Sequence, residues 1–152
     1  MGGQQVLVFN AERCTGCLYC QVACSFKHYG VASFDKAFIQ VAEDPVAPLR
    51  FVASFCAHCE HPRCQAACPT SAVKKSPETG LTTIDKMKCI GCMNCQLACP
   101  VSNPRFEQVG RAAVKCDLCG GDPVCVKFCS AGALRLLPRE EAKELVRAIG
   151  NV

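Results

Sequence analysis

The sequence predicts a small α+β protein, with short strands and short helices around four cysteine-rich loops and a helix at the C-terminal end. Three observations lead to this prediction. Four similar cysteine runs are spread along the 152 residues. Short apolar segments bounded by turn-forming residues lie between the runs. The last part of the chain instead has apolar residues at helical spacing. This length suits one compact domain or two small ones.

The regular elements are expected in the stretches that lack cysteine. Residues 68–84 are predicted to contain a hairpin, because residues 76–80 include the proline and glycine of a turn. Residues 139–149 are predicted to form a helix that packs on its own domain. Its apolar stripe comprises Ala142, Leu145, Val146 and Ile149. Further strands are predicted at residues 6–9, 34–41, 51–55, 109–115 and 134–137.

The sixteen cysteines fall into four groups of four, and none is left over. Four such groups match the ligand demand of four [4Fe–4S] clusters, each held by four thiolates. Cysteines at i, i+3 and i+6 allow a tight loop to wrap three corners of a cubane, and we expect the fourth cysteine near the start of a helical turn. The runs are Cys14-x2-Cys17-x2-Cys20-x3-Cys24, Cys56-x2-Cys59-x4-Cys64-x3-Cys68, Cys89-x2-Cys92-x2-Cys95-x3-Cys99 and Cys116-x2-Cys119-x5-Cys125-x3-Cys129.

Disulfides and zinc are the two alternative uses of so many cysteines. A short cysteine-rich chain is typical of secreted disulfide proteins, but residues 1–5 lack the basic and apolar regions of a signal peptide. Structural zinc sites use pairs of CxxC separated by a spacer, whereas the first and third runs place three ligands in one loop. Iron–sulfur clusters are therefore favoured, and the expected compartment is a reducing cytoplasm.

The formal net charge of +4 does not indicate a nucleic-acid-binding protein. An oxidised [4Fe–4S] cluster with four thiolates carries about −2, so four clusters would change the net charge to about −4. The basic residues are scattered, with no basic run and no interleaved aromatic platform. No apolar stretch approaches the ~18 residues of a membrane span. The modest apolar content implies that the clusters fill part of the interior, so the chain without iron is expected to be largely unfolded.

Residues 13–137 resemble the four-cluster iron–sulfur subunits of anaerobic oxidoreductase complexes, which include subunits of molybdenum and tungsten enzymes, carbon monoxide dehydrogenase and hydrogenases. Residues 56–64 look like the second motif of that family, and residues 115–119 look like its fourth. Within the family, the small subunits of tungsten aldehyde oxidoreductases are the most similar. That similarity lies in residues 14–17, 23–28 and 110–116. Ser25 and Ser130 depart from the family pattern, in which proline often follows the last cysteine, and this departure concerns the local turn rather than ligation.

The resemblance implies two interleaved dicluster ferredoxin-like units, the inner one inserted into the outer one. The outer unit would comprise residues 1–49 and 109–137, the inner unit residues 50–108, and the C-terminal helix residues 138–152. Runs one and four would share two clusters, and runs two and three the other two. The implied ligand sets are Cys14/Cys17/Cys20/Cys129, Cys116/Cys119/Cys125/Cys24, Cys56/Cys59/Cys64/Cys99 and Cys89/Cys92/Cys95/Cys68. Since the chain has no tryptophan in place of a ligand, four cubanes are expected.

The resemblance also implies a non-catalytic relay of single electrons between a catalytic tungsten or molybdenum subunit and a second redox subunit, such as a flavoprotein. No cysteine would remain as a nucleophile, and no glycine motif for a nucleotide phosphate is present. A freely diffusing polyferredoxin and an iron–sulfur assembly scaffold remain open as alternatives, as does end-to-end self-association. His58 and His61 are expected to be surface loop residues, the alternative being a hydrogen bond that makes a cluster potential pH-dependent.

Overall fold

The computed structural model describes residues 4–149, and of residues 146–149 only the backbone. By its contacts the chain divides into two compact units, Met1–Ala53 with Pro123–Val152, and Ser54–Asp122. We call the first the outer unit and the second the inner unit. The unit boundaries predicted from the sequence were based on which cysteines share a cluster. Contacts within the chain do not test cluster ligation, so those boundaries stay a prediction.

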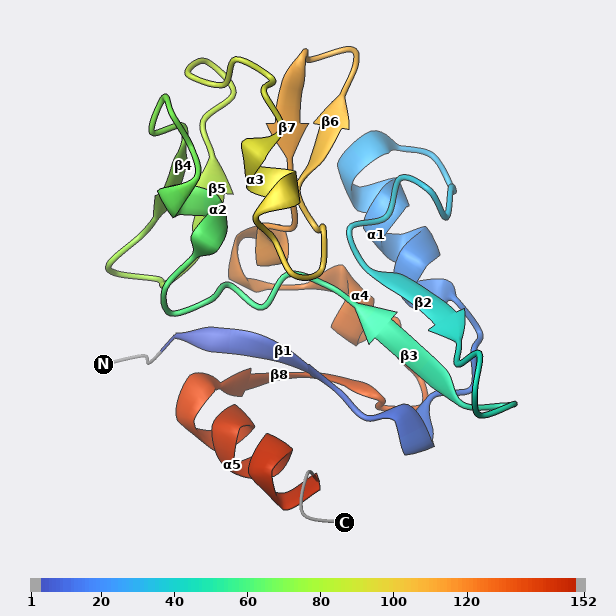
Figure 1. The fold of residues 1–152 in the computed structure, drawn as a ribbon. Helices are drawn as coiled ribbons and strands as arrows, with labels where there is room; N and C mark the ends of the chain where they lie inside the picture. The colour runs from blue at the N-terminus through green and yellow to red at the C-terminus, as the bar shows by residue number, and fades with distance from the viewer. Residues whose placement is uncertain (1–3, 150–152) are drawn as a thin grey trace. The chain divides into compact units, whose positions relative to one another are not determined.

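The outer unit contains an antiparallel sheet that joins the two ends of the chain. Strand β1 (Gln5–Phe9) pairs with β8 (Leu134–Pro138), as Figure 1 shows. Backbone hydrogen bonds extend the pairing past both strand ends, from Asn10 N to Ala133 O at 2.8 Å and from Arg139 N to Gln4 O at 2.8 Å. The strands predicted at residues 6–9 and 134–137 are therefore confirmed.

The C-terminal helix α5 (Arg139–Ile149) packs on this sheet and begins where it was predicted to begin. Glu140 and Glu141 lie in its first turn, where the helix dipole favours negative charge. The side chains of Val146 and Ile149 lie outside the described residues. Ala142 and Leu145 lie on the packed face as predicted, in a small core with Val6, Val8 and Leu137.

The rest of the outer unit consists of three helices and a second hairpin. The 3-10 helix η1 (Ala11–Arg13) leads into the first cysteine run, and α1 (Tyr19–Tyr29) packs against α4 (Val124–Lys127). Strand β2 (Gln40–Glu43) pairs with β3 (Phe51–Ser54), which confirms the strand predicted at residues 51–55.

The strand predicted at residues 34–41 is wrong over most of its length, because β2 starts only at Gln40. Residues 34–36 form a turn instead. The side-chain amide of Gln40 donates to the carbonyls of Phe34 at 2.9 Å and Ala37 at 2.8 Å. These bonds hold the chain in a compact bend, which apolar alternation alone did not reveal.

The inner unit consists of two short hairpins and short helical turns (Figure 1). The predicted hairpin is confirmed, with its turn at residues 76–80. Strand β6 escaped prediction because three residues are too few to show a period. The elements are α2 (Arg63–Ala66), β4 (Val73–Lys75), β5 (Thr82–Ile84), α3 (Asn94–Leu97), β6 (Arg105–Glu107), β7 (Ala112–Val114) and η2 (Leu118–Gly121), with β4 pairing β5 and β6 pairing β7.

Cysteine makes up half of one hydrophobic cluster in the inner unit. The buried members are Cys64, Val73, Cys95 and Ala113, and the partly buried side chains packed on them are Cys68, Ile84, Cys89 and Met93. Because four of these eight side chains are thiols, bound clusters would complete this core. Within residues 4–149, none of the helices combines the length and apolar character needed to cross a bilayer.

Candidate iron–sulfur sites

Each cysteine run enters a helix at the same point. The third cysteine of every run is the second residue of a helix, which makes these residues Cys20, Cys64, Cys95 and Cys125. The prediction that the fourth cysteine starts the helical turn is therefore wrong. In runs two to four the fourth cysteine follows the end of the helix, and in run one it lies within the longer α1. The third thiol is thus held by the most regular part of each loop.

The residue before the second cysteine has a left-handed backbone in all four runs. Glycine occupies this place in runs one and three, where φ is 69° at Gly16 and 71° at Gly91. His58 with φ 43° and Leu118 with φ 54° occupy it in the other two. A left-handed backbone costs a non-glycine residue about 1–2 kcal/mol. Both of these side chains are deeply buried, so packing supports a turn that glycine adopts without strain.

Replacement of Gly16 by alanine is expected to weaken the first cluster loop. The added Cβ would overlap the ring of Phe51 as well as occupy a left-handed backbone. We expect the stability of the loop to fall by about 2 kcal/mol or more. The effect would be measured as a faster decrease of the visible cluster absorbance during anaerobic heating. Gly30→Ala is the matched control, because Gly30 has φ 68° but no neighbouring atom within 4 Å of its Cβ position. Equal effects of both substitutions would contradict a role for the Phe51 contact.

The two serines that replace proline after a run behave differently. Ser25 lies inside α1, where proline would remove a helical hydrogen bond, and its hydroxyl donates to Val22 O at 3.0 Å. Ser130 instead lies in a turn in which Gly132 N donates to Cys129 O at 3.0 Å. The proline-containing runs make the corresponding bond. The turn therefore differs in run one only.

Burial of the sixteen thiols follows their place in the run. The third cysteine is buried in every run, whereas the second is exposed in runs one to three. The buried residues are Cys20, Cys24, Cys56, Cys64, Cys95 and Cys125, and the exposed ones are Cys17, Cys59 and Cys92. The half-buried ones are Cys14, Cys68, Cys89, Cys99, Cys116, Cys119 and Cys129. Runs one to three thus each have one edge open to solvent and one edge in the core.

Three thiols of run one and one thiol from the distant run four line one cavity of the outer unit. Its lining comprises Cys14, Cys17, Cys20 and Cys129 together with Phe9, Thr15, Leu18, Val41, Ala131, Ala133 and Leu134. Burial raises the pKa of the Cys20 thiol to about 11, against a backbone hydrogen bond from Gln21, and the charges of Cys129, Cys17 and Cys14 raise it further. Four thiols in a largely apolar cavity form the donor set that a [4Fe–4S] cluster needs.

In the inner unit, the thiol of Cys64 lies among charges from several segments. Burial raises the pKa of Cys64, while the Lys115 ammonium lowers it and the charges of Cys56 and Cys99 raise it. Cys99 belongs to run three, whereas Cys56 and Cys64 belong to run two. The electrostatic neighbours of Cys64 therefore include the fourth cysteine of the other run.

The thiol of Cys95 has a corresponding set of neighbours. Burial raises the pKa of Cys95, a backbone hydrogen bond from Gln96 lowers it, and the charges of Cys89 and Cys68 raise it. Cys68 is the fourth cysteine of run two. The third cysteine of each run in the inner unit therefore has the last cysteine of the other run as a neighbour, which is compatible with the pairing implied by the family resemblance.

Backbone N–H groups point at several of the sulfurs. Phe38 N donates to Cys24 Sγ at 3.2 Å and Leu134 N donates to Cys129 Sγ at 3.4 Å. In the inner unit, Ala113 N donates to Cys89 Sγ at 3.2 Å and His58 N to Cys56 Sγ at 3.4 Å. Hydrogen bonds to sulfur are one determinant of cluster potential.

Several hydrogen bonds also converge on the sulfur of Cys68. Burial raises the pKa of this thiol, but hydrogen bonds from the Val73 backbone, from the hydroxyl and backbone of Thr70 and from the Ala72 backbone outweigh burial, and the net pKa is lowered. The loop that leads from run two into strand β4 therefore stabilises the thiolate form of Cys68.

The fourth predicted set divides between the two units. Cys24 and Cys125 lie in the outer unit, in the packed helices α1 and α4. Cys116 and Cys119 lie in the inner unit. This set stays a prediction.

A family model, the 4Fe–4S dicluster domain, matches residues 47–139 of the chain. The chain belongs to the 4Fe–4S dicluster domain family. The aliphatic sulfonate oxidoreductase polyferredoxin-like subunit of Pyrococcus furiosus is 37% identical over 123 residues, which cover 81% of this chain and 70% of that protein. The thiosulfate reductase electron transfer subunit of Salmonella typhi is 32% identical over 160 residues, which cover 97% of this chain and 82% of that protein. A component of the anaerobic dimethyl sulfoxide reductase of Escherichia coli is 30% identical over 163 residues, with coverage of 95% and 78%.

Membership of the dicluster family confirms the prediction of an iron–sulfur electron-transfer protein with a small α+β, ferredoxin-like fold. Sixteen cysteines are consistent with four [4Fe–4S] clusters. The relatives are polyferredoxin-like or electron-transfer subunits rather than catalytic ones, which agrees with the prediction that this chain is not itself an enzyme. The finer assignment to tungsten aldehyde oxidoreductases stays a proposal.

The two histidines of the second cysteine run, His58 and His61, have different environments. His61 is exposed, as expected of a surface loop residue. The same expectation is wrong for His58, which is 1% exposed. Its Nδ1 accepts a hydrogen bond from Thr82 N at 3.0 Å, so the ring proton lies on Nε2. His58 links the second cysteine run to strand β5 rather than facing solvent.

Lys115 is a functional candidate that sequence analysis missed. It directly precedes the fourth run, but nothing in the sequence distinguishes it from an exposed lysine. In the structure it is 7% exposed, and its ammonium is close enough to Cys64 to lower the pKa of that thiol. The ammonium donates to the carbonyl of Thr82 in β5, a long-range contact that motif spacing does not describe.

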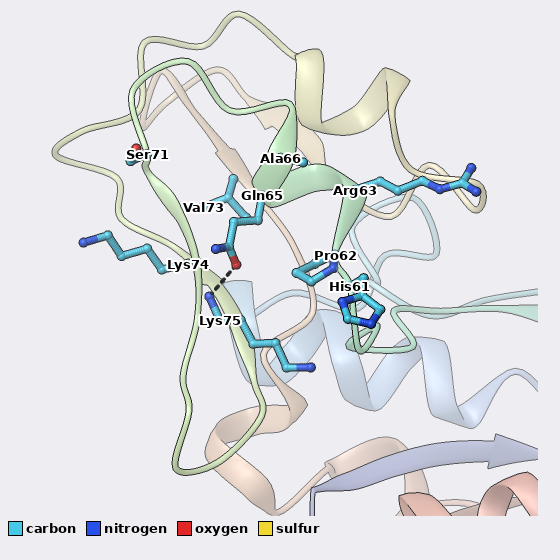
Figure 2. Close-up of a pocket in the computed structure, with 9 residues that line it drawn as sticks. All are labelled: His61, Pro62, Arg63, Gln65, Ala66, Ser71, Val73, Lys74 and Lys75. Atoms are coloured by element: carbon cyan, nitrogen blue, oxygen red, sulfur yellow. Dashed lines mark hydrogen bonds between the residues drawn. The ribbon is translucent and has the colours of Figure 1, made fainter.

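An open hollow lies beside the second run and is lined by no cysteine (Figure 2). Its lining comprises His61, Pro62, Arg63, Gln65, Ala66, Ser71, Val73, Lys74 and Lys75. Lys75 N donates to Gln65 Oε1 at 3.0 Å, and Lys75 Nζ donates to the carbonyls of Cys59 at 2.8 Å and Glu60 at 3.1 Å. Lys75 therefore holds the backbone of the second cysteine run in place.

Replacement of Lys75 by methionine is expected to loosen the second loop. The variant loses two charge-assisted hydrogen bonds to the carbonyls of Cys59 and Glu60, which costs about 1 kcal/mol at this exposed site. We expect iron release to a chelator to become about fivefold faster, followed by visible absorbance. Lys74→Met removes the same charge from an exposed neighbour and should leave the rate near that of the parent protein. Similar acceleration in both variants would contradict the bracing role.

Proposed function

We propose that this dicluster protein relays single electrons through four [4Fe–4S] clusters between a catalytic metalloenzyme subunit and a second redox partner. The observation that carries the proposal is the single cavity lined by Cys14, Cys17, Cys20 and Cys129. Thiols that are neighbours in sequence can meet for many reasons. A fourth thiol contributed to the same cavity from the far end of the chain matches the crosswise ligation of dicluster proteins.

The proposed ligand sets follow the crosswise pairing. Electrostatic neighbours of Cys20, Cys64 and Cys95 support three of them, and the remaining set rests on the family resemblance. The sets are Cys14/Cys17/Cys20/Cys129, Cys116/Cys119/Cys125/Cys24, Cys56/Cys59/Cys64/Cys99 and Cys89/Cys92/Cys95/Cys68.

The chain would hold each cluster by four thiolates, and each cluster would supply one-electron redox chemistry. The protein contributes the rigid helix start at the third thiol and the backbone donors to sulfur. Burial keeps water from the third thiol of each run, whereas the exposed second cysteine of runs one to three leaves one side of the loop accessible. Such an arrangement protects the sites while leaving a short path to a partner surface.

We infer that the catalytic partner is a tungsten aldehyde oxidoreductase, because residues 14–17, 23–28 and 110–116 are most similar to that subgroup. The second partner would be a flavin-containing or other redox subunit, in a reducing cytoplasm. The named relatives belong to sulfonate, thiosulfate and dimethyl sulfoxide systems, so a molybdenum enzyme, carbon monoxide dehydrogenase or hydrogenase is the alternative partner class.

Three other arrangements make different predictions about the isolated chain. A freely diffusing polyferredoxin would purify as a monomer that is reduced and reoxidised reversibly, and end-to-end association would give larger species in light scattering. An assembly scaffold would transfer its clusters rapidly to an apo acceptor. A permanent electron-transfer subunit would instead purify with a large metalloenzyme.

Metal analysis of native material, isolated anaerobically and normalised to this chain, tests the proposal. About sixteen irons per chain together with tungsten are expected. The same iron content with molybdenum or nickel would overturn the aldehyde oxidoreductase assignment and retain the relay. Four zincs without iron would overturn the electron-transfer proposal itself.

A further inference from the structure

The buried charge of Lys115 sets one candidate cluster apart from the others. Among the side chains described, no other lysine, arginine or carboxylate is fully buried. Lys115 Nζ donates to Thr82 O at 2.5 Å and to Cys116 O at 3.0 Å. Within residues 4–149 no carboxylate forms an ion pair with it. Two neutral carbonyls orient this ammonium but do not neutralise it.

An isolated buried ammonium is costly, and proteins normally pair such a charge. Lys115 shares its partner Thr82 with His58, which lies between the ligands Cys56 and Cys59, and its ammonium lowers the pKa of the buried Cys64 thiol. His58 offers no second cation nearby, because its Nδ1 accepts a bond from the same Thr82 residue and the ring is neutral. The positive charge of Lys115 is thus matched to the ligand set that contains Cys64.

We propose that Lys115 provides a built-in counter-charge for the cluster held by Cys56, Cys59, Cys64 and Cys99, and that it raises the reduction potential of this cluster more than that of any other. The inference rests on the proposed function, since it requires that cluster. Reduction adds one negative charge to the site. A nearby ammonium therefore stabilises the reduced form more than the oxidised form. Because the charge is buried, solvent screens it far less than it screens a surface lysine.

An anaerobic redox titration followed by electron paramagnetic resonance tests the proposal. Lys115→Met removes the charge and the two hydrogen bonds, and Lys115→Gln removes the charge while keeping a donor for the carbonyls. Both variants should shift one cluster to a lower reduction potential. At a fixed solution potential the oxidised-to-reduced ratio of that cluster should rise at least tenfold, which corresponds to about 59 mV. The other three clusters should shift less, and the two whose ligand sets lack both Cys64 and Cys116 should keep their potentials. The shifted component should be the one that disappears in Cys59→Ala, a ligand of the same set.

Two controls separate charge from structure. Lys74→Met removes an exposed charge of the inner unit and should shift no component. Lys115→Arg keeps the charge and should keep the potential near that of the parent protein. A normal potential in Lys115→Gln, or an equal shift of all components, would overturn the proposal. If Lys115→Met fails to retain iron, Lys115→Gln and Lys115→Arg still decide it. Absence of clusters from the parent chain would instead overturn the proposed function.

Discussion

Removal of iron is expected to unfold most of this dicluster protein. Half of the side chains in one hydrophobic cluster of the inner unit are cysteines, and the paired strands of this unit are three residues long. Such short hairpins are marginal in water without a larger core. Cluster binding should therefore supply folding free energy, as structural metals do in small metal-binding domains. Chelation of the iron should abolish most of the ordered circular dichroism signal and any cooperative thermal transition.

Reconstitution with iron and sulfide under anaerobic conditions is the control for this experiment. It should restore both the visible absorbance and the cooperative transition. The outer unit offers an internal comparison, because β1, β8 and α5 form a small core of aliphatic side chains that includes no cysteine. An iron-free chain that still melted cooperatively across both units would contradict the expectation.

Replacement of Cys129 by alanine is expected to remove the cluster of the first run. Cys129 lines the same cavity as Cys14, Cys17 and Cys20, although it lies in run four. The paramagnetic signal lost in Cys129→Ala should therefore be the one lost in Cys17→Ala. The matched comparison is Cys125→Ala, four residues away in the same run, which should remove a different signal.

Each cysteine variant is expected to lose one of the four [4Fe–4S] signals and up to about four irons per chain. Such a measurement reads the ligand sets directly, because each thiol is assigned by the signal that disappears. Loss of the same signal in Cys129→Ala and Cys125→Ala would show that run four binds one cluster by itself. Crosswise ligation would then be wrong.

Local sequence was sufficient for much of the fold. Turn residues 76–80 located the hairpin of β4 and β5, and the spacing of Ala142 and Leu145 located helix α5 on its packed face. Prediction failed where side-chain hydrogen bonds overrode the local pattern. The amide of Gln40 holds a bend at residues 34–37 that resembled a strand, and three-residue β6 is too short to show a period.

The cysteine spacing by itself determined the number of thiols, the kind of cluster they suit and the family of the chain. Those properties are local, because a cubane imposes its loop geometry on a few consecutive residues. Only the tertiary structure brought Cys129 to the cavity of run one and buried His58 and Lys115 beside run two. Burial and long-range proximity arise from the packing of segments that are far apart in sequence. A charge such as that of Lys115 acquires its influence on a nearby cluster only when that packing excludes water from it.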